Sequence, residues 1–250
     1  MPSLRHYEIA EADHRILNPF TDQKLALLGQ VCRLRQGERH LDLACGKGEM
    51  LCRWAAEHGT TGVGVDISQV FLTAARQRAE EMGVADRVDF IPGDATQYQA
   101  QPGGFDIVSC IGATWIGDGL VGTINLMRPA LRPGGLLLVG EPYWITDPPA
   151  AAYQALDVRR DDFTSLSGML DRFTAAGTAL VEMVLADGDS WDRYTAAHWW
   201  TITEWLAAHP DDPEAPAMRD FLDNSRRSYL RYNRTYLGWG VFALRTLPGT

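Results

Sequence analysis

The 250-residue chain lacks three features that would each assign it to a large class of proteins. It has no apolar run long enough to cross a membrane and no apolar leader near its start, so we expect a cytoplasmic protein without a membrane partner. Its basic residues number 23 against 32 acidic ones, and the resulting net charge of −9 disfavours nucleic acid as a partner. Its few cysteines lack the paired spacing of a metal site, and we expect free thiols at Cys32, Cys45, Cys52 and Cys110.

Short apolar runs alternate with helical patterns from about residue 31, which predicts an α/β fold with a mostly parallel sheet. Strands are expected at 40–44, 61–66, 88–91, 105–110, 136–140, 179–186 and 239–244. Helices are expected at 48–58, 68–82, 120–131 and 165–176, with a break at Pro133-Gly134-Gly135. The pattern predicts one domain over 1–250, comprising an N-terminal cap (1–30), a core (31–186), a helical lid insertion (187–237) and a last strand (238–250).

A turn of small residues joins the first expected strand to the first expected helix. Residues 41–48 read LDLACGKG. Small residues let the backbone approach a ligand closely, and a helix N-terminus offers unpaired N–H groups. Asp66 ends the second strand, 66 − 48 = 18 residues after Gly48, where a carboxylate suits the two hydroxyls of an adenosine ribose. The combination predicts a site for an adenosine-containing cofactor.

Five segments resemble the motifs of the class I S-adenosylmethionine (SAM)-dependent methyltransferases, in that family's order and spacing. They lie within residues 31–144 and read DLACGKG, VGVDIS, FIPGDAT, FDIVSCIGATW and LRPGGLLLVGEPYW. Residues 1–30 and the stretches EMVLAD, WDRY and GWGVFAL resemble little-characterised bacterial small-molecule methyltransferases. The resemblance implies a Rossmann-like fold with helices on both faces, strand order 3-2-1-4-5-7-6 and an antiparallel seventh strand. It also implies SAM as cofactor and S-adenosylhomocysteine (SAH) as product.

The resemblance assigns roles at the cofactor site as well. Asp66 would bind ribose, Asp94 the adenine amine and Asp42 the ammonium, while apolar neighbours enclose the adenine ring. Asp66 and Asp94 also have simpler explanations: Asp66 as an acid at a helix start, favoured by the helix dipole, and Asp94 as a cap of its loop. The implied cofactor-binding set is Asp42, Ala44, Cys45, Gly46, Gly48, Asp66, Ile67, Gly93, Asp94, Ala95, Cys110 and Ile111.

Ala44 stands where the first motif of the family usually has glycine. An alanine methyl group is a small intrusion. We therefore expect that this position does not require a positive φ, and that cofactor binding survives the substitution.

Three other functions compete with this interpretation. An NAD-dependent oxidoreductase would have a third glycine in the turn, where this chain has Glu49, Met50 and Leu51. A nucleic-acid methyltransferase would have an Asn/Asp-Pro-Pro-aromatic motif after the fourth strand, where Gly112 and Ala113 stand instead. A non-catalytic SAM-binding regulatory protein would have the same cofactor motifs, so turnover is what distinguishes it.

Methyl transfer from SAM is an in-line displacement that requires the acceptor about 3 Å from the methyl carbon, and a base only where the acceptor arrives protonated. The acceptor is expected to be a small molecule, and its reacting atom (O, N, S or C) stays open. Catalytic candidates are Glu141, His14 and Tyr194, of which the first two have alternative explanations as a structural carboxylate and a capping histidine. No metal-ligand cluster is recognisable, which argues against a metal-dependent mechanism.

Aromatic residues gather after the fourth and fifth strands and in the insertion at 187–237. In open α/β sheets ligands bind beyond the carboxyl ends of the strands, so these residues are candidates for acceptor binding. For most aromatics of the insertion, packing onto the sheet is the competing explanation. The predicted acceptor-binding set is Trp115, Tyr143, Trp144, Tyr194, His198 and Trp199, and the protein is expected to be a monomer or a homodimer.

Overall fold

A single mixed sheet organises the computed structural model, which describes residues 3–247. The strand order is β3-β2-β1-β4-β5-β7-β6, and β7 pairs antiparallel with both β5 and β6. This confirms the expected order and the reversed last strand. The predictions for residues 1–2 and 248–250 lie outside the described residues. The strands are β1 (Arg39–Leu43), β2 (Thr61–Asp66), β3 (Val88–Pro92), β4 (Phe105–Ile111), β5 (Leu131–Trp144), β6 (Thr178–Leu185) and β7 (Leu237–Thr246).

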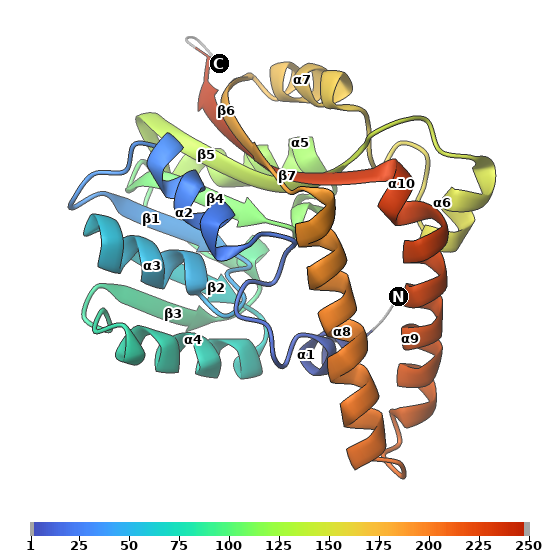
Figure 1. Ribbon diagram of the computed structural model, residues 1–250. Coiled ribbons are helices and arrows are strands. Elements are labelled where there is room, and N and C mark those ends of the chain that lie inside the picture. Colours follow the sequence, from blue (N-terminus) through green and yellow to red (C-terminus); the bar gives the residue numbers. More distant parts are fainter. Residues whose placement is uncertain (1–2, 248–250) are drawn as a thin grey trace.

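Helices cover both faces of the sheet (Figure 1). On one face lie α2 (Asp22–Val31), α3 (Glu49–His58) and α4 (Gln69–Glu81), where Trp54 and Leu72 are fully buried. On the other face α5 (Leu120–Met127) and α7 (Leu166–Ala175) bury Ile124 and Phe173. These apolar layers account for the near-continuous hydrophobic strands between them, because such strands are buried on both sides.

Helix α8 (Gly188–Ala208) and helix α9 (Ala215–Ser228) form an antiparallel pair beside the sheet (Figure 1). Asp187 begins α8 with a capping box: the Asp187 carboxylate accepts from the Ser190 amide, and the Ser190 hydroxyl accepts from the Asp187 amide. The short α1 (Leu4–Ala10) packs on this pair through an apolar cluster: Ile9, Ala10, Ile202, Met218 and Leu222. The predicted insertion is thus helical, and it continues through a π-helical turn (Tyr229–Asn233) and α10 (Arg234–Tyr236) into β7.

Strand β5 is longer than the sequence predicts. The predicted helix at 120–131 ends at Met127, a 3-10 turn follows over Arg128–Ala130, and the strand runs from Leu131 to Trp144. The Pro-Gly-Gly segment lies inside the strand, where the register with β4 shifts and Gly134 takes a φ of +76°. At its far end β5 stays extended because β7 pairs with it as far as Trp144.

Three shorter elements lie near the carboxyl ends of the strands. A 3-10 turn at Thr114–Gly117 follows β4, and another at Ala95–Gln97 follows β3. Helix α6 (Ala150–Leu156) follows β5 and begins after Pro149. No helix among the described residues is both long and apolar enough to span a bilayer.

Candidate active site

A cavity of about 530 Å³ lies at the carboxyl ends of β1, β2 and β4. Such a position, outside the strand ends of an open α/β sheet, is where ligands of this architecture bind. Its floor comes from the turns after the strands, and the segment around α1 and Tyr194 of α8 closes it from the other side. Floor residues are Asp42, Ala44, Cys45, Gly46, Asp66, Ile67, Asp94, Ala95, Thr96, Ile111, Gly112 and Ala113.

The turn after β1 has a left-handed backbone at alternate positions. Ala44, Gly46 and Gly48 have φ values of +59°, +54° and +65°. The expectation that Ala44 needs no positive φ is therefore wrong, because the chain turns from β1 into α3 within the five residues 44–48. At Gly48 a Cβ would lie 2.5 Å from the Phe90 ring, so only glycine fits there.

Asp66 ties this turn to the end of β2. Its Oδ2 accepts from the Gly46 amide at 2.8 Å, and its Oδ1 accepts from the Ser68 amide at 2.8 Å. Burial raises the pKa of the Asp66 carboxyl, and the backbone amides oppose that rise. The carboxylate also lines the cavity, so it can accept further hydrogen bonds from a ligand there.

Asp42 belongs to a buried hydrogen-bond network with Ser109 and His40 that sequence reasoning missed. The hydroxyl of Ser109 on β4 donates to Asp42 Oδ1 at 2.5 Å, and His40 Nε2 lies 2.7 Å from the same hydroxyl. Asp42 is 4% exposed, and burial raises its pKa to about 7. Burial also lowers the pKa of His40, to about 3, so the imidazole is neutral. Register alone brings these residues together, since His40 pairs with Ile107 and Asp42 with Ser109.

The other predicted cofactor residues divide into two groups. Asp94 caps the turn after β3, with its Oδ1 accepting from the amide (2.9 Å) and hydroxyl (2.8 Å) of Thr96, and it lines the cavity. Ile67 lines the cavity and is 64% exposed. Gly48, Gly93 and Cys110 are not among the lining residues: they sit at the N-cap of α3, after β3 and inside β4.

Glu141 lies beneath the cavity wall. It is 3% exposed within β5, its Oε2 accepts from the Thr114 hydroxyl, and it is not among the residues that line the cavity. Burial raises the pKa of Glu141 to about 7. The sequence prediction put Glu141 after the fifth strand, whereas the strand continues for three residues beyond it.

The predicted acceptor-binding aromatics are spread over three places. Trp115, 74% exposed, and Tyr194 line the cavity. Tyr143 lies over Gly238, and Trp144 packs against Tyr153 and Phe163, both away from the cavity because β5 extends through them. Trp199 joins α8 to α9, where its indole donates to the Ser225 hydroxyl at 2.9 Å.

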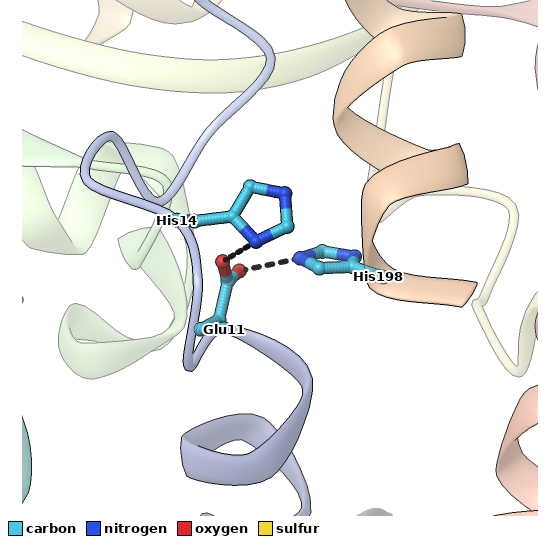
Figure 2. A group of neighbouring side chains, drawn as sticks. All are labelled: Glu11, His14 and His198. Carbon is cyan, nitrogen blue, oxygen red and sulfur yellow. Dashed lines mark ion pairs between the residues drawn. The ribbon is translucent and has the colours of Figure 1, made fainter. Parts of the chain in front are cut away.

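The segment after α1 brings a carboxylate and two imidazoles together (Figure 2). Glu11 Oε2 lies 3.4 Å from His14 Nδ1, and Glu11 Oε1 lies 3.0 Å from His198 Nε2 of α8. The Tyr194 hydroxyl donates to Glu11 Oε1 at 2.5 Å. Burial raises the pKa of Tyr194 and lowers that of His14. Sequence reasoning picked out the two histidines and the tyrosine but missed Glu11.

Lys47, within the turn after β1, holds this segment in place. Its Nζ donates to the carbonyl oxygens of Glu11, Ala12 and His14 at 2.7, 2.8 and 2.7 Å. The only signal in the sequence was a lysine inside a turn of small residues, which gave no indication of its partner. The cofactor turn and the N-terminal segment are thereby joined directly.

The sheet order, the antiparallel β7 and a cavity floored by a small-residue turn with strand-end acids define the Rossmann-like methyltransferase class. Comparison with known proteins agrees. A family model described as a methyltransferase domain matches residues 41–135. The chain is 48% identical to the uncharacterised protein YjhP of Escherichia coli (strain K12), over 96% of this chain and 97% of YjhP.

Two solved structures are similar over nearly their whole length. A SAM-dependent methyltransferase from Geobacter sulfurreducens, in complex with SAH, is 49% identical with a TM-score of 0.93, covering 98% of each chain. A SAM-dependent methyltransferase from Thiobacillus denitrificans, also in complex with SAH, is 48% identical with a TM-score of 0.93, covering 98% of this chain and 100% of that one. The chain belongs to the SAM-dependent methyltransferases, which confirms the resemblance.

Proposed function

We propose that this enzyme transfers the methyl group of SAM to a small-molecule acceptor, and that donor and acceptor share the cavity described above. The observation that carries the proposal is that one cavity has two halves with different linings. One half has the acids and small residues of a nucleoside site. The other half is mostly apolar and is formed by Leu4, Tyr7, Arg15, Ile16, Leu17, Trp115, Ile116 and Tyr194.

The residues of the first half fit SAM chemically. Gly46 has no side chain, and a Cβ there would lie 2.7 Å from Leu17 Cδ1, so glycine lets Leu17 pack directly on the turn where both residues line the cavity. Asp66 and Asp94 offer carboxylates for ribose hydroxyls and the adenine amine, and Ile67 and Ile111 offer apolar contact for the ring. Asp42, held by Ser109, would face the ammonium. When bound, SAM supplies a methyl group already activated by sulfonium.

The protein's part in the reaction is to align the acceptor and to keep water out. Tyr194 is the predicted catalytic residue that lines the cavity, and we assign it contact with the acceptor. Glu141 and His14 act through other groups, the first by holding Thr114 and the second by contacting Glu11 and the Tyr194 carbonyl. The net charge of −9 supports a small molecule rather than nucleic acid as acceptor.

The test is turnover. The purified enzyme is incubated with SAM and a panel of small acceptors that carry hydroxyl, amine, thiol or activated carbon groups, and SAH and methylated mass are followed by mass spectrometry. We expect one acceptor class to give both products in equal amounts. Asp66→Asn should weaken SAH binding by about tenfold or more in calorimetry, while Asp89→Asn on the exposed side of β3 should not.

Two results would overturn the proposal. Tight SAM binding with no acceptor turned over would indicate the non-catalytic regulatory alternative. Absence of any SAH binding, together with binding of a nicotinamide dinucleotide, would indicate an oxidoreductase.

A further inference from the structure

The cluster of Glu11, His14 and His198 has the geometry of a metal-ligand set. One ligand atom from each residue can be chosen so that all three lie within 4.8 Å of one another. The closest pairs, carboxylate to imidazole, are 3.0 and 3.4 Å apart. Two ligands bonded to one ion at about 2.1 Å each lie roughly 3 to 3.5 Å apart in octahedral or tetrahedral geometry. Each carboxylate–imidazole pair is therefore already at the spacing of two ligands on one ion, the two pairs using different oxygens of Glu11.

The atoms that would bind the ion have no other hydrogen-bond partner. Glu11 Oε2, His14 Nδ1 and His198 Nε2 are buried, and none of them forms a hydrogen bond within the described chain. Glu11 as a residue is 5% exposed. Buried polar atoms nearly always form hydrogen bonds in folded proteins, so three buried atoms whose polar contacts among the described residues are only among Glu11, His14 and His198 need an explanation.

The hydrogen bonds around the cluster fix the tautomer of His14. Its Nε2 lies 3.2 Å from the backbone carbonyl of Tyr194, which can only accept, so Nε2 carries the proton. In the neutral ring Nδ1 then presents a lone pair to the Glu11 carboxylate (Figure 2). Two acceptors facing each other repel, and a cation between them removes the repulsion. An outer hydrogen bond to a carbonyl is also the usual support of a metal-bound histidine.

Other contacts hold the ligands before any ion arrives. The Tyr194 hydroxyl donates to Glu11 Oε1. Lys47 fixes the backbone carbonyls of Glu11 and His14, and the Thr201 hydroxyl of α8 donates to Asp13 Oδ2 in the same segment at 2.8 Å. The turn after α1 and helix α8 are thus fixed against each other, as a preorganised site requires.

We infer that Glu11, His14 and His198 form a binding site for one divalent transition-metal ion at the edge of the cavity. Two imidazole nitrogens and one carboxylate suit Zn²⁺, Fe²⁺ or Co²⁺, whereas Mg²⁺ and Ca²⁺ prefer oxygen ligands. The spacing of residues along the sequence gave no sign of it, because His198 comes from a distant helix. Three protein ligands leave a coordination position open.

The open position gives the ion a role that rests on the proposed function. Glu11 and Tyr194 both line the cavity, so an exchangeable ligand would reach the ion from the acceptor half. An oxygen or sulfur donor of the acceptor is the class of group that such an ion binds, and a bound hydroxyl or thiol has a lowered pKa. The binding site itself does not depend on that role.

The test uses Co²⁺ as the probe, in the absence of SAM. The full-length protein is stripped with chelator and titrated with Co²⁺, followed by calorimetry and by visible absorption of the ligand field. We expect one equivalent to bind and to be displaced by Zn²⁺. His198→Ala and Glu11→Gln should each weaken Co²⁺ binding at least tenfold. His209→Ala, a matched change on an exposed histidine after the same helix, should leave it unchanged.

Folding is monitored separately, because Glu11 is buried. Circular dichroism identifies any variant that fails to fold, and His198→Ala then decides, since its side chain is partly exposed. Zn²⁺ should raise the unfolding temperature of the wild type and not that of His198→Ala. Absence of saturable Co²⁺ binding in the wild type, or equal binding in His198→Ala, overturns the site. Co²⁺ binding without any methyl transfer would instead overturn the proposed function alone.

Discussion

Two carboxyl groups near the active site are buried with hydroxyl partners instead of cationic ones. Ser109 donates to Asp42 and Thr114 donates to Glu141, and neither carboxylate forms an ion pair within the described chain. A single hydroxyl stabilises a carboxylate less than a cation does. Burial therefore dominates and raises the pKa of each to about 7. These residues make the stability of the enzyme depend on pH near neutrality.

Glu141→Gln tests this dependence. The pKa of Glu141 rises from 4.5 in the unfolded chain to about 7, so its contribution to stability is present below pH 4.5 and is lost as the pH rises through 7. The glutamine variant lacks this loss. Relative to wild type, its free energy of unfolding should improve between pH 5 and pH 8 by an amount on the order of 3 kcal/mol at most. Urea unfolding at both pH values measures it.

Glu182→Gln is the matched control, since Glu182 lies exposed on β6. Its free energy of unfolding should follow the wild type at both pH values. If Glu141→Gln also followed the wild type at both, burial would not control the ionisation of Glu141.

Ala44→Gly tests the backbone of the cofactor turn, the turn after β1 at residues 44–48. Alanine at a φ of +59° is strained, whereas glycine adopts this conformation freely. Because glycine also makes the unfolded chain more flexible, the net gain in stability should be only about 0.5–1 kcal/mol. Ala74→Gly, inside α4, should lose about 0.5–1 kcal/mol. Denaturant unfolding of the two variants should therefore shift in opposite directions, and a loss of stability in Ala44→Gly would contradict the prediction.

At the scale of elements, long-range polar contacts join the N-terminal segment (residues 4–15) to two parts of the molecule, in addition to its apolar packing on α8 and α9. Lys47 binds three of its carbonyl oxygens, and the Ser68 hydroxyl at the start of α4 donates to Glu8 at 2.6 Å. On the other side His6 lies 2.7 Å from a carboxylate oxygen of Glu214 at the start of α9. The segment therefore joins the cofactor turn to the α8–α9 pair.

Lys47→Met should loosen this connection. The variant keeps most of the apolar stem but leaves three carbonyl oxygens without their donor. We expect faster amide hydrogen exchange over residues 8–15 and weaker SAH binding by about tenfold. Lys24→Met, which removes only an ion pair with Asp187, is the control and should change neither. Unchanged exchange in Lys47→Met would mean that other contacts suffice to hold the segment.

The strands were predictable because their signals are local, whereas their order came from the family resemblance. Apolar runs, strand-end acids and the glycine turn identified β1 to β4 within a residue or two. The extension of β5 to Trp144 was not, since it depends on pairing with β7, almost a hundred residues away. The misplacement of Glu141, Tyr143 and Trp144 follows from that one error.

For the whole molecule, the floor of the cavity at the strand ends was predictable, whereas the opposite side, formed by the segment around α1 and by α8, was not. Asp42 lies near the end of β1, Asp66 ends β2 and Asp94 follows β3, and parallel strands bring their carboxyl ends to the same edge. Contacts between the first and last parts of the chain hold that opposite side together, as in the pairs of Glu11 with His198 and with Tyr194. No periodicity or spacing encodes such contacts, so only the folded chain reveals them.

The molecule has separate apolar cores, one set in the sheet and one between α1, α8 and α9. The cavity lies where they meet, because its lining includes the turn after β1 as well as Tyr7 and Tyr194. A ligand in the cavity therefore contacts both parts. It should slow local opening at their junction more than elsewhere.

Hydrogen exchange with and without SAH tests this at the scale of the whole chain. We expect SAH to slow exchange at residues 44–48, at α1 and in the first half of α8, which carries Tyr194. Helix α7 and strand β6 lie away from the cavity and serve as internal controls that should not change. At a hundredfold excess over its Kd, the ligand should also add about 2.7 kcal/mol to global stability. Slowing confined to residues 44–48 would show that the N-terminal segment and α8 do not close over the ligand, and that the acceptor half of the cavity is open to water.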